Sequence, residues 1–260
     1  MAMKRLVLII FSILVFTTQS GIVYASIGNQ ATGSVQIIST DSELFCGKTL
    51  TEWKHFGANI INGTDGKDVI HGSNKIDVII AKSGDDIVLA GDGDDCIIGG
   101  TGNDRIIGDK GNDVIFGNEG NDIIDGGKGD DFVDGGSGND RITGNHGNDT
   151  IMGGDGNDKI WGGLGNDTMD AGTGNDWVNG GIGDDTIRAG SGDDRIFGGP
   201  GHDDLFGEGD NDKIHGGQGN DNLNGGSGTD NCHDKQGSNN FISCERRIPI
   251  NEEDEPENDE

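Results

Sequence analysis

Aliphatic residues recur once every nine positions from residue 63 to residue 233, and glycine and aspartate keep the same phase. The segment 99–107, GGTGNDRII, shows the unit: Gly, Gly, any residue, Gly, Asn or Asp, Asp, any residue, an aliphatic residue, any residue. The eighth position is aliphatic in all nineteen units except at Cys232, and the fourth is glycine except at Lys75 and Asp210. A phase kept without insertion or deletion indicates a structural repeat.

This unit predicts a β-solenoid, because nine residues with one aliphatic side chain bury a core only by stacking on their neighbours. Glycine at positions one, two and four permits positive φ angles, and Asn or Asp at position five tolerates left-handed backbone. Six residues would then form a turn, and three would form a strand whose aliphatic side chain points inward. Consecutive units would alternate between two facing sheets, with one coil every 18 residues and roughly nine coils.

The sixth position is aspartate in every one of the nineteen units. Stacking would place these carboxylates in two files, one along each edge of the solenoid, with neighbours about one strand separation apart. Such files repel strongly unless they are neutralised. Calcium accepts many oxygen ligands in a flexible shell, so carboxylate and carbonyl oxygens of adjacent turns suit it, whereas magnesium requires a tight octahedron. The pattern therefore favours bound calcium ions.

On these residues the chain resembles the RTX, or haemolysin-type, calcium-binding nonapeptide family, whose repeat reads G-G-x-G-x-D-x-U-x. The resemblance implies an all-β protein, a right-handed parallel β-roll of nineteen repeats with short N-terminal and C-terminal caps. Calcium would lie between turns, held by turn carbonyls and by the sixth-position carboxylates. The implied metal ligands are Asp68, Asp77, Asp86, Asp95, Asp104, Asp113, Asp122, Asp131, Asp140, Asp149, Asp158, Asp167, Asp176, Asp185, Asp194, Asp203, Asp212, Asp221 and Asp230.

Two of these turns depart from the family pattern. The turn before Asp77 reads GSNKID, with Lys75 in place of glycine and Ile76 in place of Asn or Asp. The turn before Asp212 reads GEGDND. These two turns are the weakest members of the implied ligand set.

The first residues carry the features of a secretory signal. Lys4 and Arg5 precede an apolar run from Leu6 to Phe16, and small residues end at Ala25. Such a segment is typical of export with cleavage before the next residue. A membrane-spanning helix needs about 20 apolar residues, so this shorter run predicts no retained anchor. We therefore expect a secreted protein, located outside the cell or at its surface, where calcium is abundant.

The composition divides the chain into five parts. We expect a signal peptide at 1–25, an N-terminal cap segment at 26–62, the calcium-binding β-roll at 63–233, a C-terminal cap at 234–247 and a disordered acidic tail at 248–260.

Four cysteines allow three pairings, and export permits disulfides. Cys232 and Cys244 flank the end of the repeats, so a bond between them would staple the last coil. A bond between Cys46 and Cys96 would clamp the N-terminal segment onto the roll. Free thiols are the alternative.

The outward positions of the early repeats are unusually apolar. They are occupied by Val78, Ile80, Ile87, Leu89, Ile98, Ile107, Val114 and Phe116. An apolar patch of this size is usually covered. We expect residues 31–62 to pack over it as an N-terminal cap, which solenoids require. The alternative is a docking face for a protein partner, a cell-surface partner or a second copy of the chain.

Charge and missing motifs narrow the function. The net charge is −29 and the isoelectric point is near 4.2, which argues against a nucleic-acid partner. The chain lacks the HExxH, GxSxG and GxxxxGK[ST] signatures, so we expect no enzymatic activity. The sequence predicts an exported, calcium-binding β-roll that folds on calcium and serves a structural or adhesive role at the cell surface or in the matrix.

Two alternative functions stay open at this point. One is an accessory that acts in trans on an exported enzyme or toxin through the apolar outer face of the early repeats. The other is ice binding by the aligned outward threonines Thr150, Thr168 and Thr186.

Overall fold

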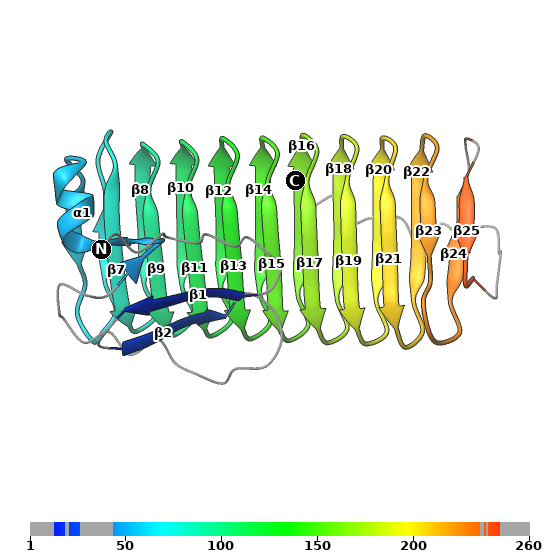
Figure 1. The fold of residues 1–260 in the computed structure, drawn as a ribbon, viewed down its shortest axis with the longest axis horizontal. Coiled ribbons are helices and arrows are strands. Elements are labelled where there is room, and N and C mark those ends of the chain that lie inside the picture. Colours follow the sequence, from blue (N-terminus) through cyan, green and yellow to red (C-terminus); the bar gives the residue numbers. More distant parts are fainter. Residues whose placement is uncertain (1–12, 19–20, 27–43, 235–236, 238, 245–260) are drawn as a thin grey trace, which may run out of the picture.

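The computed structural model describes residues 13–18, 21–26, 44–234, 237 and 239–244 (Figure 1). Near the start, β1 (Ile13–Thr18) and β2 (Gly21–Ser26) pair as an antiparallel hairpin. This hairpin falls within and just beyond the predicted signal peptide, whose cleavage stays a prediction. The predicted acidic tail and the first residues of the N-terminal cap segment lie outside the described residues.

Strands β5 to β25 form a parallel β-roll of two facing sheets. Even-numbered strands make a 10-stranded sheet and odd-numbered strands make an 11-stranded sheet, called here the even sheet and the odd sheet. Each strand pairs with the next but one along the chain, so that Ile106 lies beside Ile124, 18 residues later. The coil is right-handed and has about ten turns, drawn as a straight rod in Figure 1. The predicted fold class is confirmed.

The strand bounds follow the nine-residue period. The even sheet contains β6 (Val69–His71), β8 (Ile87–Asp92), β10 (Arg105–Lys110), β12 (Ile123–Lys128), β14 (Arg141–His146), β16 (Lys159–Leu164), β18 (Trp177–Ile182), β20 (Arg195–Pro200), β22 (Lys213–Gln218) and β24 (Asn231–His233). The odd sheet contains β5 (Asn59–Asn62), β7 (Asp77–Ser83), β9 (Cys96–Thr101), β11 (Val114–Glu119), β13 (Phe132–Ser137), β15 (Thr150–Asp155), β17 (Thr168–Thr173), β19 (Thr186–Ser191), β21 (Asp204–Gly209), β23 (Asn222–Asn224) and β25 (Asn240–Ile242).

Most of these strands are six residues long, so the expected three-residue strand was wrong. Positions seven to nine of one repeat continue directly into positions one to three of the next, as in β14. The turn is correspondingly shorter than expected. Parallel pairing continues through positions two and three, where Asn145 pairs with Gly163 and His146 with Leu164.

The core is a double row of eighth-position side chains. Residues such as Ile106, Ile142 and Ile196 are completely buried, and Cys232 ends the series in the same environment. Small residues at position one, including Ala81 and Ala171, fill the space beside them. Each isoleucine stabilises the roll by burial against the coils before and after it, because a single repeat encloses nothing.

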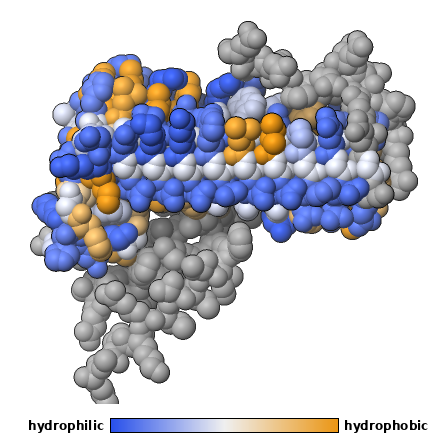
Figure 2. All heavy atoms as spheres, turned by 90° about the horizontal axis from the view of Figure 1, so that it is seen from above, coloured by the Kyte–Doolittle hydropathy of each residue, from blue (hydrophilic) through white to orange (hydrophobic). Residues whose placement is uncertain are grey.

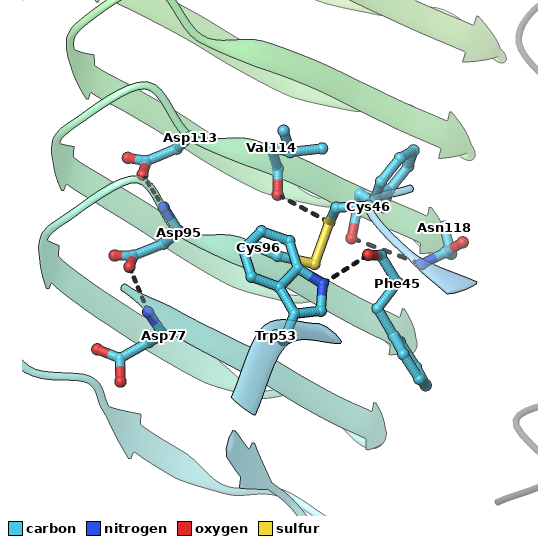
Figure 3. The surroundings of a disulfide bond; sticks show 10 residues. Phe45, Cys46, Trp53, Asp77, Asp95, Cys96, Asp113, Val114 and Asn118 are labelled. Atoms are coloured by element: carbon cyan, nitrogen blue, oxygen red, sulfur yellow. Dashed lines mark hydrogen bonds between the residues drawn. A yellow bond between two sulfur atoms is a disulfide. The ribbon is translucent and has the colours of Figure 1, made fainter. Parts of the chain in front are cut away.

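A small cap covers the start of the odd sheet. It comprises β3 (Leu44–Phe45), β4 (Lys48–Thr49) and the helix α1 (Leu50–His55). A capping box between Thr49 and Glu52 begins the helix, and the Trp53 indole N–H donates to the Phe45 carbonyl over 2.8 Å (Figure 3). This cap packs on the outer face of the odd sheet.

The cap forms a separate apolar cluster with the strands beneath it. Phe45 and Trp53 pack with Val78, Ile80, Cys96 and Ile98. The predicted covering of the early apolar patch is thus confirmed for the odd sheet. Ile87, Leu89 and Ile107 do not belong to this cluster, because they lie on the even sheet, which faces the opposite way. The patch is therefore two surfaces rather than one.

Both expected disulfides form. Cys46 joins Cys96 across 50 residues and ties the cap to β9, beside Trp53 (Figure 3). Cys232 joins Cys244 and ties the segment after the last repeat to β24. Cys96 sits at an outward strand position but is completely buried, because the cap covers it. At the C-terminal end, β25 extends the odd sheet, and Phe241 packs against the core.

The core can be tested with two neighbouring isoleucines of β12. Ile124 is 1% exposed and Ile123 is 44% exposed. We expect Ile124→Ala to lower the free energy of unfolding in saturating calcium by about 2–5 kcal/mol, because it leaves a cavity between coils. The control Ile123→Ala is expected to change it by no more than about 0.5 kcal/mol. Equal losses of unfolding free energy for both variants in urea would contradict a core built only from the eighth-position side chains.

Candidate calcium sites along the turn edges

The sixth-position aspartates line both edges of the roll from inside. Every one from Asp77 to Asp230 is at most 2% exposed, whereas Asp68 is half-buried. They follow the turn and directly precede the strand, so the coil repeats their position every 18 residues. Carboxylates buried this completely require partners for both oxygens.

One carboxylate oxygen links each coil to the coil before it. The backbone N–H of Asp122 donates to Asp140 Oδ1 over 2.7 Å, and the N–H of Asp140 donates to Asp158 Oδ1 over 2.8 Å. Figure 3 shows the same bond from Asp77 to Asp95 and from Asp95 to Asp113. Side chain and backbone of the repeated aspartate thus form a continuous hydrogen-bonded file. The nine-residue pattern predicted the two files of carboxylates but not this hydrogen bond between coils.

The other carboxylate oxygen has no hydrogen-bond donor. In the described part of the chain, Oδ2 is buried and unpartnered in Asp86, Asp95, Asp104, Asp113, Asp122, Asp131, Asp140, Asp149, Asp158, Asp167, Asp176, Asp185, Asp194, Asp203, Asp212 and Asp221. Leaving a buried acceptor without a partner costs about 1–3 kcal/mol, and more when it is charged. Because the same unpartnered oxygen recurs along both edges, each edge offers a row of candidate cation sites.

Backbone oxygens face the same spaces. A Cβ built on Gly135, at position one, would lie 2.6 Å from Asp140 Oδ2 and 2.7 Å from the carbonyl oxygen of Gly153 in the next coil. A Cβ on Gly138, at position four, would collide with the carbonyl oxygen of Gly120 in the preceding coil. Carbonyl and carboxylate oxygens therefore converge on the space beside Gly135 and Gly138. Several hard oxygens without a donor fit calcium.

The donor set also limits the kind of site. Among the described residues, no group of three or more His, Cys, Asp or Glu side chains is close enough to share a metal ion. Each calcium would therefore take one carboxylate or two and complete its shell with turn carbonyls. A site of this kind exists only while adjacent coils are stacked.

Without calcium, burial disfavours the ionised form of the sixth-position aspartates. It raises the pKa of Asp140, Asp113 and Asp194 to about 8, against the bonds from backbone N–H groups, which lower it. Neighbouring carboxylates of the same file raise the pKa of Asp140 further. The same cause raises the pKa of Asp104 and Asp167 to about 6. A bound cation would remove this penalty.

The first turn on each edge differs from those that follow. Thr64 and Ser73 occupy position two, where most later repeats have glycine. The N–H and hydroxyl of Ser73 donate to Asp77 Oδ2 over 2.6 and 2.9 Å, and Thr64 does the same for Asp68. These bonds lower the pKa of Asp68. Hydroxyl groups therefore supply the donors that the later carboxylates lack.

The hydroxyl donors divide the predicted ligands into Asp68 and Asp77, which have them, and the later aspartates, which lack them. Asp77 was already the weakest because of Lys75, but the hydroxyl at Ser73 is a different reason. Asp212, in contrast, resembles the central aspartates: it is 1% exposed, its Oδ2 has no partner, and its Oδ1 accepts from the N–H of Asp194. A serine or threonine at position two was the signal in the sequence.

The fifth position serves an outer ladder. The backbone N–H and the amide of Asn139 both donate to Asn121 Oδ1, over 2.8 and 3.1 Å. The expected left-handed backbone at this position was wrong, since positive φ angles occur at positions two and four, as at Asn118 and Asp210. Asn and Asp recur at position five because their side chains bond the next coil.

The fold and these oxygen-lined edges define a calcium-binding β-roll. The family model for the RTX calcium-binding nonapeptide repeat matches this chain in seven overlapping segments: residues 56–74, 71–106, 98–133, 134–169, 143–178, 170–205 and 197–232. The chain therefore belongs to the family of RTX calcium-binding nonapeptide repeat proteins. No curated protein matches it across the sequence. No helix among the described residues is long and apolar enough to cross a membrane.

Replacing one buried carboxylate separates the effects of charge and shape. We expect Asp140→Asn to reduce the number of bound calcium ions and to destabilise the calcium-loaded roll by roughly 1–3 kcal/mol, because a ligand oxygen is lost. The same variant is expected to stabilise the calcium-free roll near neutral pH, because folding no longer has to protonate or bury a charged carboxyl at this position. Asp155→Asn is the control, since Asp155 is exposed. The measurement is the unfolding midpoint of Asp140→Asn relative to the unchanged protein, with calcium and without it. Shifts in the same direction under both conditions would contradict this account.

The raised pKa values also predict a pH dependence of the calcium-free protein. The folded pKa of Asp140, about 8, lies above the ordinary value of 3.8, so the unfolded chain releases this proton first. Stability from protonated carboxyls is then fully present below about pH 4 and is lost as pH rises through about 6–8. Circular dichroism of metal-stripped protein should show more β-structure at about pH 5 than at about pH 8. The opposite order would show that the aspartates are ionised without calcium.

Proposed function

We propose that this protein is an exported, non-enzymatic β-roll that folds on calcium and acts as a structural or adhesive element at the cell surface or in the matrix. The observation that carries the proposal is the unpartnered Oδ2 of the buried aspartates. Multiple calcium ions would occupy the edges, and binding free energy would become folding free energy. Outside the cell, weak sites of this kind fill because calcium is abundant.

The remaining described chain supports a scaffold rather than a catalyst. The roll occupies residues 59–242, and the described residues before it form the β1–β2 hairpin, the two-strand turn of β3 and β4, and α1. Binding surfaces are what such a rod offers, because its interior is a filled row of aliphatic side chains. Family membership alone does not define the role, which depends on what the outer faces contact.

Export agrees with the covalent structure. Two disulfides, one at each end of the roll, suit an oxidising compartment. The predicted signal at residues 1–25 would supply the route. N-terminal sequencing of secreted protein should then begin at Ser26.

The alternatives have less support. The accessory role needed the early apolar face, but the cap already buries Val78, Ile80 and Ile98. Ice binding has Thr150, Thr168 and Thr186 in exact register on adjacent strands of the odd sheet. That file is short, because Phe132 and Asp204 follow at its two ends.

Calcium-driven folding is tested by far-ultraviolet circular dichroism of residues 26–260. We expect a change from coil to β-structure on adding calcium, reversal by a chelator, and no comparable change with magnesium, because magnesium requires a tighter shell. A β-spectrum that a chelator leaves unchanged would contradict the proposal, and the core and caps alone would then hold the roll.

A further inference from the structure

One outer face of the roll differs sharply from the rest of this acidic chain. The six even-sheet strands from β14 to β24 contain no Asp or Glu, although the chain has 47 of them. The odd-sheet strands along the same length carry Asp155, Asp170, Asp204 and Glu208. The outer surface of β14 to β24 is called here the β14–β24 face.

A continuous row of rings runs along this face, parallel to the axis of the roll. Trp161, Trp177, Phe197, His215 and His233 come from five adjacent strands, with ring centroids 4.8, 5.6, 6.1 and 5.5 Å apart. All five are half-buried, so part of each ring is exposed at the surface of the roll. The Arg141 guanidinium lies 4.2 Å from the Trp161 ring at the start of the row. This set of five rings is called the ring ladder.

Cationic side chains accompany the ring ladder. Lys159 pairs in register with Trp177, Trp177 with Arg195, and Arg195 with Lys213. Lys159, Arg195 and Lys213 are exposed. They place a positive charge on β16, β20 and β22, in a chain whose net charge is −29. The face therefore complements a ligand that carries repeated negative charges.

Apolar side chains border the same surface. Leu164 and Ile182 pair at the ends of β16 and β18 and are 44% and 56% exposed. Figure 2 shows that hydrophobic side chains interrupt a hydrophilic row midway along the roll. The combination of rings, cations and exposed aliphatic groups identifies a binding surface.

We propose that the β14–β24 face binds a linear acidic polysaccharide of the polyuronate type, with carboxylate-bearing sugars in an extended chain. Sugar rings have flat faces that stack on aromatic rings, and the ladder supplies such rings at strand spacing over about 19 Å. The cations pair with spaced carboxylates. A denser polyanion, such as a nucleic acid, would be repelled by the net charge of the chain. This inference rests on the proposed adhesive function and names its partner.

The experiment uses the full secreted chain in calcium and a short oligogalacturonide that does not gel. Two of the three tryptophans lie in the ladder, and Trp53 lies in the cap, so intrinsic fluorescence reports binding. We expect saturable binding by fluorescence and calorimetry, weaker at high salt, with no comparable binding of an uncharged cello-oligosaccharide. Trp177→Ala should weaken binding about tenfold, and Trp177→Phe should retain most of it. Arg195→Gln should weaken binding without changing the fold.

Phe206→Ala is the control, since Phe206 lies at the same repeat position as Phe197 of the ladder but on the odd sheet, beside the Arg188 guanidinium. It should leave the affinity unchanged, and an equal loss in this variant would overturn the proposal. So would the absence of oligogalacturonide binding by a β-folded sample, or binding only to phosphatidylserine vesicles, which would assign the face to a membrane. Circular dichroism of the same sample shows whether the roll has folded in calcium. A sample that stays unfolded would contradict the proposed function rather than the proposed binding surface.

Discussion

The buried carboxylate of the sixth position imposes the constraint on which the rest of the roll depends. One of its oxygens binds the backbone of the preceding coil, as Asp140 does with Asp122, and the other faces carbonyl oxygens with no donor. The glycines at positions one and four, such as Gly135 and Gly138, lie where these oxygens crowd, and a Cβ built there would meet them. Such an edge is unstable as an uncompensated row of charges and stable as a row of cation ligands.

The first coils show how the chain ends such a row without a cation. Ser73 and Thr64 provide a hydroxyl and an N–H for Oδ2 of Asp77 and Asp68, so this oxygen has its donors within its own turn. Oδ1 of Asp77 is buried without a hydrogen-bond partner. At this end the cap also covers the odd sheet, and the bond from Cys46 fixes it. The N-terminal end of the roll is therefore built to be stable without a stacking neighbour.

The sequence predicted the features that depend on period. Stacking of the eighth-position residues, the β-roll class and both cysteine pairs follow from phase and position, and the structure confirms them. Features that depend on where individual atoms point were missed. The six-residue strands, the bond to Asp140 Oδ1 and the ladder through Asn121 require the actual distance between coils. The early apolar positions were treated as one patch, although the predicted alternation of units between two sheets already places Val78 and Ile87 on opposite faces.

Outward positions seven and nine are free of this constraint, and they differ between the two sheets. On the odd sheet they bind the cap through Val78 and Ile80, and on the even sheet they form the ring ladder. A rigid core with variable faces is what lets a repeat protein present an extended surface. Calcium binding would depend on the turn edges, and contacts with partners would depend on the outer faces. Both need stacked coils, because the faces form only when the coils stack.

The most direct test of this account is a crystal structure of the calcium-loaded protein with anomalous data that locate the ions. The account predicts ions between successive turns beside Oδ2 of the central aspartates, such as Asp140 and Asp158, in one file along each edge. It predicts no ion at the hydroxyl-bonded carboxylates of Asp68 and Asp77. Ions found only on exposed carboxylates, with the turn edges empty, would contradict it.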